Sequence, residues 1–404
     1  MSLVSFRRIL PFAIVVFLAY VGFSLPLPLF PELFLDPQHS ILPASYSIGV
    51  KTVILGVVMA SFPLGQFLGA PFLGRMSDTW GRKKIILLSL FGTTLGYTCT
   101  GLAVQMHSVA GIFFCLMFSG FCEGNIAIAQ AVIADLEEGA SRTTSFGWLN
   151  MFISFGFIVG PLLGGQLVQP HLVGWTAYAM PFYAASVMTL LGIAIIHFFA
   201  KETRVAMREK IARRSLWQVW GHPSLQRLFL INFFLWMGIF LYWRYLPVFL
   251  ERFFAFRAAQ QSYVLIYDSL IIALAIPFIV GPLARRTSSA KAAGWGGLFL
   301  ALTLVIVVLP RFPEALFFTI PPIGIGLAIV MTNSTSMVSN AASANMQGLA
   351  MGSLAALQVL AEVITTAGGG FVAGGHPAFP LFLGALLLSI GSVIVLYELK
   401  RGKL

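Results

Sequence analysis

Long apolar runs separated by short polar or Pro/Gly-containing breaks dominate this chain of 404 residues. A helix that crosses a membrane needs about 20 mostly apolar residues. Twelve runs meet this requirement, so the pattern predicts an all-α polytopic membrane protein with twelve transmembrane helices. The predicted spans are Ile9–Phe30, Gly49–Phe72, Ile85–Val104, Val109–Ile133, Ser145–Val168, Ala177–Phe199, Leu228–Leu250, Tyr263–Leu283, Ala292–Leu309, Ala315–Asn340, Met346–Gly369 and Phe379–Tyr397.

A single long polar insert, Ala200–Arg227, divides the predicted helices into two groups of six. We therefore predict an N-terminal bundle over 1–199, a basic cytoplasmic linker over 200–227 and a C-terminal bundle over 228–404. The two groups echo each other at nearly equal offsets. Gly74–Asp78 is echoed by Gly281–Arg285, and Gly160–Gly165 by Ile364–Gly369. Two echoes at one offset indicate a pseudo-symmetric duplication.

The distribution of basic residues predicts the orientation of the helices. With the N-terminus inside, twenty Lys and Arg residues fall in inner segments, and Arg244 lies within a span. Cytoplasmic loops carry an excess of such residues. Both termini are therefore expected in the cytoplasm. The basic residues left in outer loops are Lys51, Arg252, Arg257 and Arg311.

Composition narrows the possible functions. The chain is 58% hydrophobic and only 10% charged, which excludes a soluble enzyme because soluble domains are roughly 25% charged. The net charge of +11 follows the topology and does not indicate nucleic-acid binding. Three cysteines and six scattered histidines show no metal-ligand spacing, and no P-loop is present. We expect no metal site, no cofactor and no ATP-driven step.

The most specific string is Gly74-Arg-Met-Ser-Asp78-Thr-Trp-Gly81-Arg82-Lys83-Lys84. It resembles the loop between helices two and three of major facilitator superfamily transporters. Glycines permit a tight turn there, and Asp78 can cap the next helix. The resemblance implies that Gly74, Asp78, Gly81 and Arg82 form a gating motif with Asp135, at the inner end of the fourth span.

The fifth span carries Gly156-Phe-Ile-Val-Gly160-Pro161-Leu-Leu-Gly164-Gly165. This string resembles the antiporter motif of the twelve-helix drug:proton exporters, including tetracycline exporters. Small residues at such spacing let helices pack closely, and Pro161 bends the helix. A packing motif without information on transport direction is the alternative interpretation. Two positions depart from that branch: Ala19 stands where tetracycline exporters carry an aspartate, and Leu116 replaces a basic residue of the fourth helix.

Ionisable side chains inside spans are costly and are candidates for function. Because the two usual coupling positions are apolar, a proton carrier must lie elsewhere. Glu123, Glu362 and Asp268 are the candidates, and Glu123, predicted near the middle of the fourth span, is the strongest. Each could instead be a structural acid paired with a neighbouring helix.

Substrate-binding candidates cluster in the seventh and eleventh spans. Arg244 cannot lose its proton and must pair with an acid or an anionic substrate, although it could instead reach the outer surface. Gln358 lies one turn before Glu362. Trp236 and Tyr242 could line a cavity, although an interfacial aromatic belt also explains Tyr242.

The resemblance implies a secondary transporter that works by alternating access. We expect proton-coupled antiport of a small organic solute across the bacterial inner membrane, with efflux of drug-like compounds, by a monomer in the lipid bilayer. The alternative is import or export of an anionic metabolite or a siderophore-like polycarboxylate, indicated by Arg244 and Lys51. A membrane enzyme or a sensor has little support, because no catalytic cluster and no extra soluble domain are apparent.

Overall fold

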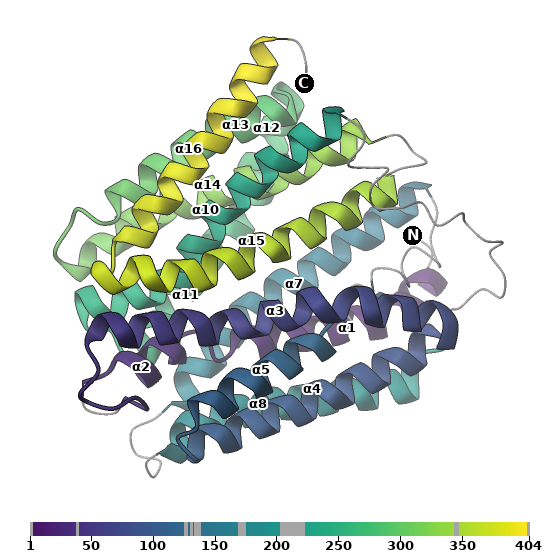
Figure 1. Ribbon diagram of the computed structural model, residues 1–404. Helices are drawn as coiled ribbons and strands as arrows, with labels where there is room; N and C mark the ends of the chain where they lie inside the picture. Colours follow the sequence, from purple (N-terminus) through teal and green to yellow (C-terminus); the bar gives the residue numbers. More distant parts are fainter. Residues whose placement is uncertain are drawn as a thin grey trace. The chain divides into compact units, whose positions relative to one another are not determined.

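The computed structural model is all-helical in the residues that it describes: 3–37, 40–124, 128–129, 132, 139–168, 175–202, 223–342 and 347–401 (Figure 1). Ten helical segments in this part of the chain are long and apolar enough to cross a membrane, and two shorter apolar helices accompany them. These segments match the twelve predicted spans in order. The shorter pair are Val109–Cys122 and Met151–Leu167.

The helices form two compact units. The first comprises residues 1–47, 57–209 and 257–266, and the second comprises residues 48–56, 210–256 and 267–404. Two helices, α3 (Ile48–Trp80) and α11 (Ala258–Ala275), therefore each contribute their first turns to one unit and the rest to the other. Residues 203–222, most of the predicted linker, lie outside the described residues.

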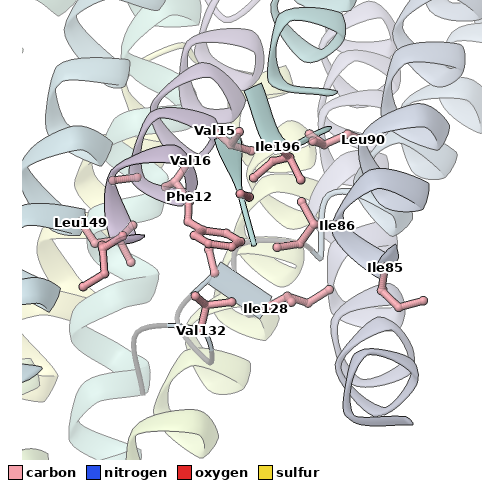
Figure 2. Packing of buried hydrophobic residues seen from close by; sticks show 14 of the residues in the cluster. Phe12, Val15, Val16, Ile85, Ile86, Leu90, Ile128, Val132, Leu149 and Ile196 are labelled. Atoms are coloured by element: carbon pink, nitrogen blue, oxygen red, sulfur yellow. The ribbon is translucent and has the colours of Figure 1, made fainter. Parts of the chain in front are cut away.

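In the first unit, α1 packs on α7 and α8, and α4 packs on α5 and α8. Figure 2 shows the buried cluster that joins α1, α4, α7 and α8, with Phe12 of α1 facing Ile86 of α4, near Ile196 of α8. The helices of this unit are α1 (Leu3–Ser24), α2 (Leu29–Leu35), α3 (Ile48–Trp80, from Val57 onward), α4 (Arg82–Gln105), α5 (Val109–Cys122), α7 (Gly139–Leu167), α8 (Trp175–Phe199) and the start of α11.

In the second unit, α10 packs on α14, α15 and α16, while α13 packs on α14 and α16. The elements of this unit are the first turns of α3, α10 (Pro223–Phe254), α11 (Ala258–Ala275, from Tyr267 onward), the π-helical turn η1 (Ile276–Val280), α12 (Gly281–Arg286), α13 (Ser289–Ile306), the 3₁₀ turn η2 (Pro313–Ala315), α14 (Leu316–Ala341), α15 (Gln347–Gly375) and α16 (Phe379–Lys400).

Side-chain exposure is that of a membrane protein. Large apolar side chains such as Phe198, Phe278 and Phe318 are exposed, whereas Glu123, Arg244 and further polar groups are buried. This pattern is the reverse of a soluble protein, in which charged groups are almost never fully buried. The exposed apolar faces are suited to lipid.

Proline residues break two of the predicted spans. The first ends as α1 at Ser24, because Pro26 and Pro28 cannot continue the hydrogen-bonded ladder, and α2 resumes at Leu29. In the eighth span, Pro277 lies in the π-helical turn between α11 and α12. A π turn relieves the clash of a proline ring inside a helix.

Candidate functional site

The loop between α3 and α4 holds a short charged network. Arg82 forms an ion pair with Asp78 at 2.6 Å, and its Nη1 also donates to Ser77 Oγ at 2.6 Å. The predicted partner of Arg82, Asp135, lies outside the described residues. The Arg82 guanidinium thus pairs with Asp78 of the same motif.

The cap of α4 is not Asp78, as the sequence suggested, but Glu202, just after α8. The Glu202 carboxylate accepts the backbone N–H groups of Arg82 at 2.8 Å and Lys83 at 3.2 Å. A carboxylate at a helix N-terminus is stabilised by the unpaired N–H groups and the helix dipole. It reaches them because Gly81 has φ of 103°, which is open to glycine at little cost.

The two glycines of this motif are predicted to respond differently to alanine. A Cβ on Gly81 would sit 2.6 Å from Glu202 Oε2, in a backbone conformation that costs L residues roughly 1–2 kcal/mol. A Cβ on Gly74 would meet nothing within 4 Å. Gly81→Ala should lower the thermal unfolding temperature in detergent, whereas Gly74→Ala should leave it unchanged or raise it. Equal shifts would contradict this description of the loop.

The glycines of the fifth predicted span form a contact stripe on α1. A Cβ on Gly156 would lie 2.7 Å from Tyr20 Cβ, one on Gly160 would lie 2.8 Å from Val21 O, and one on Gly164 would overlap Leu25 O. Gly165 instead faces Ser262 of α11, and Pro161 lies inside α7. Small residues four apart let two backbones touch. The motif acts here as the seam between α7 and α1.

Glu123 is the most deeply buried acid among the described residues of the first unit. Its side chain is 1% exposed. Tyr97 of α4 donates its hydroxyl to Glu123 Oε2 at 3.2 Å, while Oε1 has no hydrogen-bond partner among the described residues. Phe62 stacks on the Tyr97 ring with centroids 6.4 Å apart. A buried carboxyl oxygen without a partner is costly, so Glu123 stays a candidate for holding a proton or a ligand.

Glu123 does not lie within a continuous helix. α5 ends at Cys122, and Glu123 forms its C-cap, with a backbone N–H bonded to Ser119 O and Gly120 O. Gly124 follows and comes so close to Ala70 that a Cβ would lie 2.9 Å from Ala70 Cα. Glycine is unfavourable in the interior of a helix, so Gly124 favours the end of α5 at this point. The predicted span Val109–Ile133 is therefore interrupted at its acid, and Ser89 Oγ satisfies the Cys122 carbonyl at 2.8 Å.

In the second unit, Arg244 of α10 and Glu362 of α15 form a salt bridge between Nη2 and Oε1. The residues are 5% and 9% exposed, respectively. Two of the predicted site residues are thus brought together across 118 positions of sequence. Buried pairs of this kind cost desolvation energy, and breaking one side leaves an uncompensated charge.

Further contacts join α10 to α15 on either side of this pair. The Tyr245 hydroxyl donates to Thr366 O, and Arg252 Nη1 donates to Ala373 O. Gly369 is pressed against the Tyr245 ring. Gln358, the other candidate on α15, is half-buried one turn before Glu362. These contacts hold the pair in a fixed register between the two helices.

Asp268 of α11 and Tyr242 of α10 form a second polar group in this unit. They interact electrostatically, but both Tyr242 Oη and Asp268 Oδ1 are buried without a hydrogen bond to any described residue. Trp236, two turns before Arg244, is 9% exposed, and its indole N–H also lacks a partner in the described chain. The described residues contain no group of three or more His, Cys, Asp or Glu that could hold a metal.

The buried acid of α2 was not predicted from the sequence, because the first predicted span ended at Phe30. Glu32 in α2 is 4% exposed. Its carboxylate accepts the Ala258 backbone N–H at 2.8 Å and the Tyr178 hydroxyl at 3.3 Å. It therefore ties the first turn of α11 to α2 and α8. The signal was a lone acid within the apolar run Leu29–Leu35.

Removing Glu32 should destabilise the first unit. Glu32→Ala deprives a buried N–H and a half-buried hydroxyl of their acceptor, at about 1–3 kcal/mol. Glu398→Ala is the matched control, because its ion-pair partner Arg227 is 44% exposed and such pairs contribute about 0–1 kcal/mol. Thermal unfolding in detergent should show a clear loss for the first variant only. A larger loss for Glu398→Ala would contradict the assignment.

Comparison with known proteins agrees with this arrangement of helices. The chain is 29% identical over 356 residues to the tetracycline resistance protein, class C, of Escherichia coli, covering 85% of this chain and 84% of that one. It is 25% identical over 403 residues to multidrug resistance protein 2 of Bacillus subtilis, with 96% and 94% covered. The crystal structure of the human organic anion transporter MFSD10 superposes with a TM-score of 0.72 at 21% identity, covering 98% and 100%. The family pattern described as Major Facilitator Superfamily matches residues 12–366, so this multi-pass membrane protein belongs to that family of transporters, which are not enzymes.

Proposed function

We propose that this transporter exports a small, drug-like organic solute in exchange for protons, and that Glu123 carries the proton. Proton coupling and alternating access are general to the family, and relatives named for tetracycline and multidrug resistance favour efflux. The observation that carries the proposal is the Glu123 carboxyl, which is buried and has one oxygen without a partner in the described chain.

The position of Glu123 at the end of α5 suits this role. A carboxyl next to a helix break can change its surroundings with small backbone motions, whereas a continuous helix would hold it rigidly. Tyr97 supplies one hydrogen bond that either protonation state can use, because a hydroxyl both donates and accepts. Gain and loss of a proton can therefore accompany a change of conformation.

The alternative solute is an anionic metabolite or polycarboxylate. The observation that favours it is the buried Arg244, which an anion could neutralise in place of Glu362. Drug-like cations would instead use the acids Glu123 and Asp268. Gln358, Trp236 and Tyr242 remain proposed substrate contacts in either case.

A flux assay in proteoliposomes tests the proposed function. The panel comprises tetracycline, ethidium, naphthalene-1-acetate and citrate, each with an inside-acid gradient, an inside-alkaline gradient and no gradient. We expect uphill uptake of at least one solute only with the inside-acid gradient, and its loss with a protonophore. If the uptake of every transported solute were the same under all three gradient conditions, the proposal would be contradicted.

We also propose that the protein lies in the bacterial inner membrane as a monomer, with both termini in the cytoplasm and functional halves over 1–199 and 228–404. The support is the excess of basic residues in the inner segments. A reporter fused after Arg214 should give a cytoplasmic signal, and one inserted near Gln38 an external signal. A cytoplasmic signal at Gln38 would contradict the twelve-helix topology.

A further inference from the structure

We propose that Arg244 binds the carboxylate of an aromatic organic monoanion by exchange with Glu362, and that Glu362 takes up a proton as it is displaced. The inference deepens the proposed function and rests on it only in taking the pair to be part of the solute pathway. It concerns the salt bridge between α10 and α15, where both side chains are buried.

The buried position of Arg244 requires an anion beside it at all times. Arginine cannot lose its proton in a protein, and an unpaired buried charge is strongly destabilising. Glu362 supplies the required anion in the structure, through a planar carboxylate that matches the guanidinium. A ligand carboxylate has the same shape and charge, so it can replace Glu362 with little change in electrostatic energy.

Aromatic side chains next to Arg244 can contact the ring system of the ligand. Aromatic side chains lead along α10 to Arg244: the Trp236 and Phe240 centroids are 5.5 Å apart, and those of Phe240 and Trp243 are 6.1 Å apart. Phe240 precedes Arg244 by four residues and lies on its side of the helix. An aromatic ring beside such a series gains apolar and stacking contacts. The buried indole N–H of Trp236 can still donate a hydrogen bond to a ligand.

Few charged side chains lie on the helices closest to Glu362. It is the only titratable residue of α15, and α14, which packs on that helix, carries none. Arg244 can therefore pair with one anion at a time, either Glu362 or the ligand carboxylate. The titratable groups on the other elements packed against α15 are Arg227, Tyr242, Arg244, Tyr245, Glu251 and Arg252 on α10, Tyr397, Glu398 and Lys400 at the end of α16, and Lys51 in the first turns of α3.

Proton uptake follows from the exchange. Once the ligand carboxylate holds Arg244, the Glu362 carboxylate is left buried without its cation. It restores neutrality by binding one proton from water, and the ligand remains ionised. Each exchange binds one anion and one proton. The salt bridge between Arg244 and Glu362 is replaced by one between Arg244 and the ligand carboxylate. At this site an anionic solute would bind together with one proton, whereas a neutral or cationic solute would bind without one. The proton exchanged for solute in the proposed function is carried by Glu123 and not by Glu362.

Binding to the purified full-length protein in detergent tests this inference. The probe is naphthalene-1-acetate, and its control is naphthalene-1-acetamide, which has the same size and no charge. A pH indicator in weakly buffered solution should report uptake of about one proton per acetate bound, and the Kd should fall about tenfold for each pH unit lowered. The acetamide should bind more weakly and take up no proton.

Variants assign the proton and the anion to their residues. Glu362→Gln should still bind the acetate, with a Kd independent of pH and no proton uptake. Arg244→Gln should weaken acetate binding at least about tenfold, and the double variant, which buries no unpaired charge, should show the same loss. Arg227→Gln, which removes the exposed ion pair of α10 with Glu398, should behave as the wild type.

Three results would overturn the inference: no acetate binding, acetate binding without proton uptake, or uptake that persists in Glu362→Gln. None of them depends on transport. Proton-driven flux that survives such a result would leave the proposed function standing. Loss of that flux with acetate-linked proton uptake intact would overturn the proposed function and leave this inference in place.

Discussion

Glu123→Gln should abolish proton-driven uphill transport while exchange of solute without a gradient continues. Glutamine keeps the size and the Tyr97 hydrogen bond of the side chain but cannot titrate. A carrier without a titratable group still changes conformation when solute binds, but it can no longer use the proton gradient. The measurement is solute accumulation in proteoliposomes with an inside-acid gradient, against counterflow of the same solute without one.

Tyr97→Phe is the matched comparison for this prediction. It removes the hydroxyl that donates to Glu123 Oε2 but leaves the carboxyl and the stacking on Phe62. Coupled transport should persist, with a changed pH dependence. Full accumulation with unchanged pH dependence in Glu123→Gln would show that Glu123 is structural. Asp268 and Glu362 would then be the carriers to test.

Gly164→Ala should be the most damaging alanine substitution in the seam between α7 and α1. A Cβ at Gly164 would overlap Leu25 O and lie 2.9 Å from Leu25 C, so the α1 backbone itself must move. Overpacking of this kind costs about 1–3 kcal/mol. We expect a lower thermal unfolding temperature in detergent and a reduced yield of monodisperse protein by size-exclusion chromatography.

Gly368→Ala provides the control for this seam, because a Cβ at Gly368 in α15 would meet nothing within 4 Å. It should keep or slightly raise the unfolding temperature, since alanine favours a helix over glycine. If both variants unfolded at the wild-type temperature, α7 and α1 would not be in backbone contact. The glycine motif would then have no packing role.

The spans were predictable from the sequence because a membrane helix must be long and apolar whatever it packs against. The breaks within these spans were harder to predict from the sequence. Pro26 and Pro28 explain the break after α1 in retrospect, yet prolines are tolerated in other helices of the same chain, such as α7. Glu123 was placed near a helix centre, and its position at a helix end depends on the close packing of Gly124 on Ala70.

The pairing of charges was not predictable to the same extent. Arg244 was expected to need an anion, but the choice of Glu362 depends on the register between α10 and α15, which hydropathy does not set. The Glu202 cap and the Glu32 contacts also join residues more than a hundred positions apart. Such contacts are fixed by tertiary packing, so the sequence supplies candidates and only the structure pairs them.

Solute and protons should cross the membrane in opposite directions, with Glu123 coupling the two movements. The most direct test loads proteoliposomes with a pH-sensitive dye and imposes a gradient of the panel solute with the largest flux. The wild type should move protons during solute flux, and Glu123→Gln should move solute with no proton signal. Equal proton signals in both proteins, or wild-type solute flux without protons, would contradict the account.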